Sequence, residues 1–294
     1  MQKSNGSGGV TSRAPVCACS AESSVAAPSV DDAEFRVQER LTRIRHKIVV
    51  LSGKGGVGKS TVAVNLAVAL TRAGHRVGLL DVDIHGPSVP TMLGLQSARP
   101  LSDDGALLPI EFDGGLSVMS IGFLLNSRDD PVVWRGPLKD SIIQQFLGDV
   151  EWGDLDYLIV DAPPGTGDEP LSVLRLLDGL DGAVIVTTPQ EVALSDVRRC
   201  VRFCSLVGCR VLGLIENMSG LACPHCGETI DVFSRGGGQS LAEETGIPFL
   251  GAVPLDPKLV EAGDSGAPFV TAFTDSPTGE AFRQAIAPLL ALED

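Results

Sequence analysis

The sequence predicts an α/β fold, a single three-layer domain in which a doubly wound, mostly parallel sheet carries helices on both faces. Short apolar runs bounded by Gly, Pro or Asp alternate with segments of helical periodicity, which is typical of parallel strands buried on both sides. The chain of 294 residues is 44% hydrophobic and 20% charged, so it can build a sizeable core, and a disordered or fibrous protein is excluded. Neither an internal repeat nor a Pro/Gly linker divides the series, which favours one layered domain.

The N-terminal segment differs from the rest in composition. Residues 1–35 are rich in Ser, Gly and Ala and have no hydrophobic periodicity, so we predict a flexible tail there and one folded domain over 36–294. Residues 35–47 are rich in Arg and Lys, and they form either a short basic helix that leads into the first strand or simply a solvated charged face.

The remaining elements follow in a regular order. Strands are predicted at 48–51, 77–82, 116–121, 157–160, 183–187, 211–215 and 249–253. Helices are predicted between and after them at 59–72, 138–147, 171–177, 194–207, 239–245 and 279–290. In such a sheet the ligand lies outside the carboxyl ends of the strands, so functional residues are expected directly after the strands.

A phosphate-binding loop joins the first predicted strand to the helix at 59–72. The pattern G-x-x-x-x-G-K-[ST] is matched by Gly53-Lys54-Gly55-Gly56-Val57-Gly58-Lys59-Ser60-Thr61. The glycines allow successive backbone N–H groups to surround phosphate oxygens, and the helix N-terminus adds partial positive charge. Lys59 is expected to reach the terminal phosphates of ATP, and the Ser60 hydroxyl to bind Mg²⁺.

A second lysine, Lys54, lies inside this loop. The form GKGGVGKS resembles the deviant Walker A motif of the nitrogenase iron protein, MinD, ParA and Mrp-type ATPases. In that class the extra lysine contacts phosphate across a dimer interface. The resemblance therefore implies a homodimer that closes over nucleotide, with Lys54 acting in trans; the alternative is an exposed lysine in a flexible loop.

Carboxylates follow two other predicted strands. The run VGLLDVD ends in Asp81 and Asp83, and LDYLIVD ends in Asp161, so these side chains are expected to face the phosphates. By the resemblance, Asp83 matches the switch I aspartate that orients the attacking water, and Asp161 matches the Walker B residue that holds Mg²⁺ through water. With Ser60, these two complete the expected magnesium site, whereas Asp81 supports the strand end. An acidic helix cap is the alternative for Asp83 and Asp161.

Two later turns are candidates for binding the nucleoside. Asn217 follows the strand in VLGLIENMSG, and its amide can pair with the donor and acceptor edge of adenine, as the base-reading asparagine of the class does. In VPLDP, the Pro254 carbonyl and Asp256 match positions that lie near the ribose and base in relatives. A plain loop explains this second turn equally well.

Cys223 and Cys226 form a C-x-x-C motif. Two thiolates at this spacing can hold one metal ion or one edge of a cluster, but structural zinc and iron-sulfur clusters normally need four ligands. No second C-x-x-C occurs in the chain, so one chain supplies half a site, which the twofold axis of a dimer would complete. Unliganded or buried structural roles are expected for the other cysteines, Cys17, Cys19, Cys200, Cys204 and Cys209.

Taken in order, GKGGVGKS, DVDIHGPSVP, DAPPGTGDE, ENMS and CPHC resemble the Mrp family of iron-sulfur cluster carrier ATPases, relatives of ApbC. The resemblance spans residues 48–290. It implies a slow, Mg²⁺-dependent ATPase whose homodimer holds a [4Fe-4S] cluster between its subunits. The cluster would come from a donor and pass to apo-proteins.

Charge and cysteine usage restrict the partners further. The net charge of −14 repels polyphosphate backbones and anionic lipid, so neither nucleic acid nor a membrane is an expected partner. No apolar segment reaches the ~18 residues of a membrane helix, and no signal peptide is recognisable, so we predict a cytoplasmic protein. Seven cysteines, an odd number, argue against a disulfide framework.

Two alternatives to the carrier hypothesis remain. A MinD- or ParA-like switch would use ATP only to dimerise and bind a surface, but the C-terminal FRQAIAPLLALED is poor in the basic residues of a membrane-surface helix. A shared structural zinc is the other alternative, because four thiolates suit zinc as well as iron.

Overall fold

A central sheet organises the computed structural model, which describes residues 30–84, 86–103, 105–125, 136–223, 225–226 and 228–292. The sheet has eight strands in the order β12-β9-β8-β1-β7-β2-β6-β5. Neighbours from β12 to β6 are parallel, and β5 pairs antiparallel with β6 at one edge. Its strands are β1 (Ile44–Ser52), β2 (Val77–Asp81), β5 (Ile110–Phe112), β6 (Leu116–Ser120), β7 (Leu155–Asp161), β8 (Gly182–Thr187), β9 (Val211–Asn217) and β12 (Phe249–Val253).

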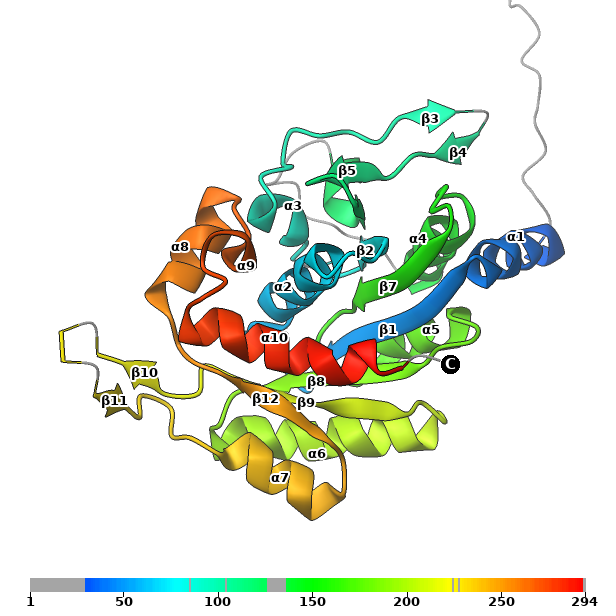
Figure 1. Ribbon diagram of the computed structural model, residues 1–294. Coiled ribbons are helices and arrows are strands. Elements are labelled where there is room, and N and C mark those ends of the chain that lie inside the picture. Colours follow the sequence, from blue (N-terminus) through cyan, green and yellow to red (C-terminus); the bar gives the residue numbers. More distant parts are fainter. Residues whose placement is uncertain are drawn as a thin grey trace, which may run out of the picture.

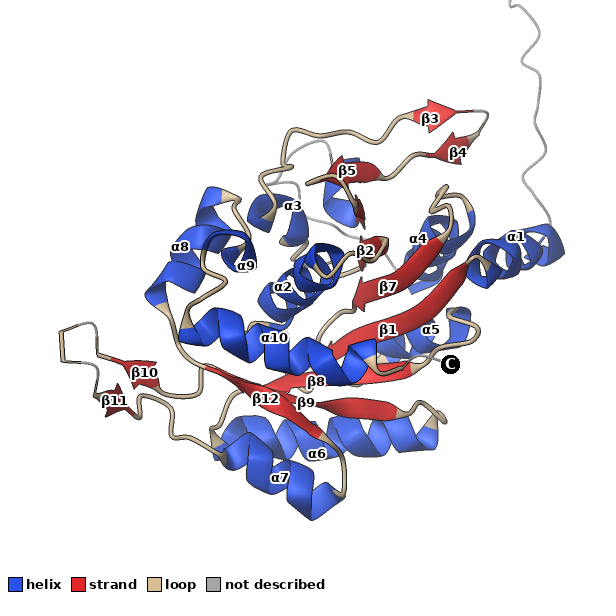
Figure 2. Ribbon diagram, in the orientation of Figure 1, coloured by secondary structure: helices blue, strands red, loops and turns tan. Residues whose placement is uncertain are grey.

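Helices cover both faces of the sheet (Figures 1 and 2). One face carries α2 (Lys59–Arg72) and α10 (Pro277–Leu290), which pack on each other and on the strands. The other face carries α4 (Gly136–Gly148), α5 (Asp168–Leu176), α6 (Glu191–Leu206) and α7 (Gly237–Thr245). Shorter helices complete the set: α3 (Val89–Met92), η1 (Ile121–Leu124), α8 (Pro257–Ser265) and α9 (Phe269–Ala272). The predicted doubly wound, three-layer fold is confirmed.

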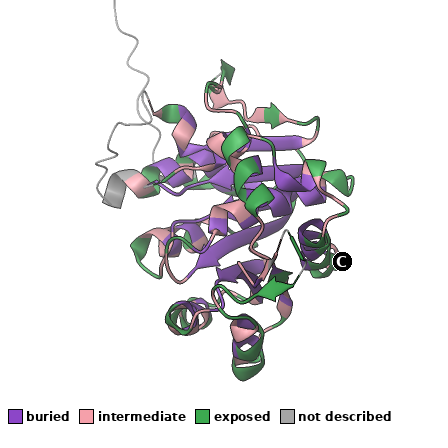
Figure 3. Cartoon of the chain, turned by 90° about the vertical axis from the view of Figure 1, so that its left-hand side faces the viewer, coloured by how far each residue is buried: buried purple, intermediate pink, exposed green. Residues whose placement is uncertain are grey.

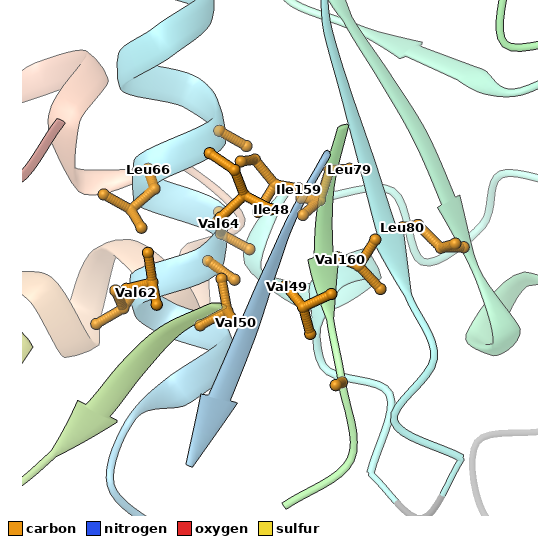
Figure 4. Close-up of a cluster of buried hydrophobic side chains, with 14 of the residues drawn as sticks. Ile48, Val49, Val50, Val62, Val64, Leu66, Leu79, Leu80, Ile159 and Val160 are labelled. Atoms are coloured by element: carbon orange, nitrogen blue, oxygen red, sulfur yellow. The ribbon is translucent and has the colours of Figure 1, made fainter. Parts of the chain in front are cut away.

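The core lies where this sheet meets its helices. Ile48, Val49 and Val50 of β1 are all 0% exposed, so both sides of this central strand are covered (Figure 3). Figure 4 shows Val50 on the side of α2 and Val49 on the opposite side of the strand. Strand residues point alternately to the two faces of the sheet. A strand that is covered on both faces therefore has a continuous apolar run in its sequence. This burial holds the carboxyl ends of the strands, and the loops that follow them, in fixed positions.

The N-terminal helix α1 (Val30–Thr42) differs from the sequence prediction at both ends. It begins within the predicted tail, so the tail assignment is wrong for residues 30–35; residues 1–29 lie outside the described residues. Val37 and Leu41 are buried, and α1 packs on α4. The basic stretch 35–47 is helical only as far as Thr42, because Ile44 already pairs with Leu155 in the sheet.

Besides the short helices α3, η1, α8 and α9, the sequence did not reveal several short strands. They are the antiparallel pairs β3 (Ser102–Asp103) with β4 (Ala106–Leu107), and β10 (Leu221–Ala222) with β11 (Thr229–Ile230), besides the edge strand β5. Two residues per strand are too few to show an alternating pattern. Across the described part of the chain, no helix combines the length and the apolar character that crossing a membrane requires.

Candidate functional site

The phosphate-binding loop lies where the direction of winding changes. From β1 the chain passes to β2 on one side, whereas from the adjacent β8 it passes to β9 on the other side. A crevice opens at the carboxyl ends of strands at such a point. Residues 53–58 connect β1 to α2 there, so the loop meets the N-terminus of α2 as the sequence predicted.

The glycines of this loop fall into two groups. A Cβ on Gly53 would lie 2.5 Å from the backbone of Asp196, and a Cβ on Gly58 would lie 2.2 Å from the amide nitrogen of Asn217. Gly58 also has a φ of 82°, in the left-handed region that favours glycine. By contrast, a Cβ on Gly55 or Gly56 would meet nothing within 4 Å. The first group lets the loop pack against the protein, and the second leaves an open cradle for phosphate.

Lys59 is the centre of a buried group of charges. Its Nζ atom lies 2.6 Å from Oδ1 of Asp161, 3.6 Å from Oδ2 of Asp83 and 3.3 Å from the Ser60 hydroxyl. Burial lowers the pKa of Lys59, but the attraction of Asp161 and Asp83 outweighs it, so the pKa lies above that of an ordinary lysine. The structure therefore brings together four residues that the sequence assigned to catalysis and Mg²⁺.

The carboxylates come from adjacent parallel strands. Asp81 of β2 is in register with Asp161 of β7, and both are completely buried. Asp81 accepts hydrogen bonds from the Ser120 hydroxyl at 2.9 Å and from the backbone N–H of Asp83 at 3.1 Å. Burial, with repulsion from Asp161, raises the pKa of Asp81 to about 8. Asp81 thus supports the strand end and orients the chain that carries Asp83.

The donor set fits a magnesium ion. Oδ2 of Asp161 is buried without a hydrogen-bond partner among the described residues. Burial raises the pKa of Asp161 although Lys59 opposes this. A divalent cation would satisfy this oxygen, and the nearby Ser60 hydroxyl and Asp83 carboxylate are oxygen ligands of the kind that Mg²⁺ prefers.

Asn217 contacts the loop itself. At the end of β9 it is 3% exposed, and its amide donates to the carbonyl of Val57 at 2.9 Å. The amide oxygen and the second N–H are not used in this bond, so recognition of adenine stays a prediction. Asp256 caps α8: it accepts from the backbone N–H of Lys258 at 2.9 Å and from the Thr278 hydroxyl at 2.8 Å. This cap gives Asp256 a structural role, and nucleoside contacts of Asp256 and of Pro254 stay predictions.

Lys54 lies in the same loop as Lys59, directly after Gly53. Its backbone carbonyl accepts a hydrogen bond from the Ser52 hydroxyl at 2.9 Å, which fixes the start of the loop. The side chain is partly exposed. A contact of this ammonium group with the nucleotide of another subunit stays a prediction.

The C-x-x-C cysteines lie on the tip of the β10–β11 hairpin, which extends from the body of the molecule at the left of Figure 1. The backbone N–H of Cys223 donates to the backbone carbonyl of Glu228 at 2.8 Å, while Cys226 is exposed. Backbone N–H groups of His225 and Cys226 lower the pKa of Cys223, which favours the thiolate that binds metals. Within the described residues, no group of three or more His, Cys, Asp or Glu could hold a metal ion.

The other described cysteines lie elsewhere. Cys200 and Cys204 are buried on α6, and Cys209 follows that helix. The neighbouring Cys200 thiol raises the pKa of Cys204 to about 12, which keeps it protonated. These residues have the properties of core thiols. Cys17 and Cys19 lie outside the described residues.

Sequence reasoning missed Glu216, which precedes Asn217 in β9. Its side chain is 0% exposed and accepts hydrogen bonds from the backbone N–H groups of Gly236 and Gly238, at the start of α7. A carboxylate within an otherwise apolar strand was the available signal, because a buried charge needs compensating donors.

Most of the chain is similar to one family of P-loop proteins: residues 43–290 match the family model described as ParA, NUBPL iron-transfer P-loop NTPase. The chain is 49% identical over 253 residues to the iron-sulfur cluster carrier protein of Methanocaldococcus jannaschii, covering 86% of this chain and 87% of that protein. It is 53% identical over 241 residues to the cytosolic Fe-S cluster assembly factor NUBP2 of Homo sapiens, covering 81% of this chain and 89% of the relative.

Solved structures give the same picture of the fold. The nucleotide-binding protein of Archaeoglobus fulgidus in complex with ADP has a TM-score of 0.71 and 41% identity, covering 79% of this chain and 91% of the other. MinD of Aquifex aeolicus has a TM-score of 0.61 and 24% identity, covering 85% of this chain and 98% of the other. This second likeness concerns the fold alone.

Proposed function

The chain belongs to the NUBPL iron-transfer P-loop NTPase family, and from this membership we propose that it is an iron-sulfur cluster carrier driven by ATP. In this proposal a homodimer binds a [4Fe-4S] cluster through Cys223 and Cys226 of each subunit and passes it from a donor to apo-proteins. The names of the relatives, cluster carrier and cytosolic assembly factor, support cluster transfer as the function and the cytoplasm as its place.

The nucleotide chemistry is assigned to the charge cluster at the loop. Lys59 is held by Asp161 at 2.6 Å, and in the proposal its ammonium group binds the terminal phosphates of ATP instead. Asp83, 3.6 Å from the same nitrogen, orients the attacking water. Ser60, Asp83 and Asp161 would hold Mg²⁺, which would neutralise charge at the phosphates. Lys54 adds a positive charge from the partner subunit, so hydrolysis is slow until the dimer has closed.

The observation that carries the proposal is the placement of the cysteine hairpin. β9 ends at Asn217, which touches the phosphate loop, and the hairpin begins at Leu221. The thiols of this hairpin are partly or fully exposed, as ligands for a cluster shared between chains must be. A structural thiol would be expected inside the protein, where Cys200 and Cys204 lie.

Anaerobic reconstitution with iron and sulfide tests the proposal. Expected results are a broad visible absorption, about four irons per dimer, and transfer of the cluster to an apo-ferredoxin. Replacing Cys223 and Cys226 by Ser should abolish iron binding without lowering stability, because these side chains are exposed or half-buried. Cys209→Ser is the matched control and should bind iron normally.

Other outcomes have defined meanings. Zinc bound in place of iron, with the same cysteine dependence, would indicate a structural clamp and reject the carrier. Stable iron binding in the double Cys→Ser variant would reject the assignment of the ligands.

A further inference from the structure

Glu216 is a buried carboxylate that the nucleotide chemistry does not use. It accepts hydrogen bonds from the Ser219 hydroxyl at 2.5 Å and from the backbone N–H of Gly236 at 2.9 Å on one oxygen, and from the N–H of Gly238 at 2.5 Å on the other. The Glu216 side chain has no exposed surface, so these donors replace the water that a carboxylate would otherwise bind. The carboxylate is therefore held in one position.

These donors lie at the two ends of the segment that carries the cysteines. Ser219 is where the chain leaves β9 towards the hairpin, and Gly236 and Gly238 are where it returns to begin α7. The return is closely packed, because a Cβ on Gly238 would lie 3.0 Å from the Glu216 side chain. One side chain thus closes the base of the loop that presents Cys223 and Cys226.

The next residue in the same strand contacts the phosphate loop. Asn217 donates to the Val57 carbonyl at 2.9 Å, and it lies against Gly58, which has no side chain. Successive residues of a strand point to opposite faces. At the end of β9, Asn217 therefore contacts the nucleotide loop, and its neighbour Glu216 contacts the base of the cysteine hairpin.

We propose that Glu216 is a positioning residue that holds the cysteine hairpin and transmits to it the state of the nucleotide loop. This inference rests on the proposed function, since it concerns how ATP governs the cluster ligands. A nucleotide that changes the environment of Val57 shifts Asn217, and the rigidly bonded Glu216 moves both ends of the hairpin with it. Without the carboxylate the hairpin is no longer fixed to β9, and its cysteines no longer respond to nucleotide.

The reactivity of Cys226 measures this coupling without any cluster. The full chain, reduced and free of metal other than Mg²⁺, is treated with a maleimide with and without a non-hydrolysable ATP analogue. Modification at each cysteine is followed by peptide mass spectrometry. In the wild type the analogue should change the rate at Cys226 at least about threefold.

Glu216→Gln should reduce this nucleotide effect to within about 1.5-fold, because an amide N–H₂ would face a backbone donor at the start of α7. Affinity for the analogue should stay within about twofold of wild type, since Glu216 points away from the loop. Ser219→Ala keeps the bonds to α7 and should retain part of the effect. Glu243→Gln makes the same chemical change on the exposed face of α7 and should behave as wild type.

The proposal is overturned if Glu216→Gln keeps the wild-type ratio of rates, or if nucleotide has no effect on Cys226 in the wild type. If Glu216→Gln does not fold, Ser219→Ala decides: a reduced ratio supports the proposal and an unchanged ratio rejects it. Failure of iron to bind on reconstitution would reject the carrier function and leave the thiol measurement standing, so the two failures are distinguishable.

Discussion

A single ammonium group, that of Lys59, compensates several buried carboxylates at the nucleotide site. Asp81 and Asp161 are both fully buried, and burial raises the pKa of each. Removing Lys59 would leave the buried carboxylate of Asp161, 2.6 Å away, without its ion-pair partner, a change that costs about 3–5 kcal/mol in buried ion pairs. The charge cluster thus makes the protein's stability depend on pH.

The pH dependence of stability should come largely from Asp81. Its pKa is about 8 in the folded chain and about 3.9 when unfolded. The folded state therefore holds an extra proton between these values, so stability is highest below them and falls as pH rises towards 8. For the metal-free protein, Asp81→Asn should flatten this decline, which is at most about 1.4 kcal/mol per pH unit. Urea denaturation between pH 5 and 8 measures it, and an unchanged slope contradicts the assignment.

Two glycines of the phosphate loop should respond differently to the same substitution. Gly58→Ala places a Cβ 2.2 Å from the Asn217 amide at a positive φ, so both stability and nucleotide affinity should fall, stability by about 1–3 kcal/mol. Gly55→Ala meets no protein atom within 4 Å, so only nucleotide affinity should fall. Thermal unfolding without ligand and titration with fluorescent ATP separate the two effects. Equal destabilisation by both variants would show that the loop adopts another conformation.

At the scale of elements, α1 belongs to the folded domain. Leu41 is 2% exposed against α4, and Arg36 pairs with Asp149 at 3.1 Å. Leu41→Ala should lower the free energy of unfolding by about 2–4 kcal/mol, whereas Phe35→Ala, at a position 66% exposed, should have little effect. Urea denaturation gives both values, and a neutral Leu41→Ala would mean that α1 is detached in solution.

The elements that the sequence predicts well are those whose burial is uniform. The stretch 48–51 of β1 and most of β8 are apolar runs, and α2 follows a recognisable motif, so pattern and structure agree. The first turns of α5 and α6 were missed because both helices begin with acidic residues, Asp168 and Glu169 in α5 and Glu191 in α6, which suit the positive end of the helix dipole but add nothing to the apolar period. For the start of β1 the sequence allows either a basic helix or a solvated charged face, because Arg45 and Lys47 interrupt its apolar pattern. Pairing with β7 decides for a strand.

The candidate site shows the same division. Motifs located the loop and the carboxylates, because phosphate and Mg²⁺ binding restrict residue types at fixed spacing. The local pattern marks Glu216 only as a carboxylate in an apolar strand; its role depends on donors that are distant in sequence, Gly236 and Gly238, which no local pattern identifies.

At the scale of the whole molecule, Lys54 should matter only in the assembled dimer. Lys54→Ala should keep the affinity of the monomer for ATP within about twofold, while ATPase activity falls at least about tenfold. Light scattering with the ATP analogue should show a weaker dimer. Unchanged ATPase activity would mean that Lys54 makes no catalytic contact across an interface. Arg72→Ala, which removes one positive charge from the same chain, is the control for loss of charge.

The orientation of the sheet also has a practical consequence for experiments on single molecules. The cysteine hairpin lies at the left of Figure 1, whereas α1 and the residues that follow α10 lie at the right. A tether, fluorophore or immobilising tag attached to the exposed surface of α1, or directly after α10, would leave the hairpin accessible. Surface-bound molecules could then be observed as donors and recipients approach in solution.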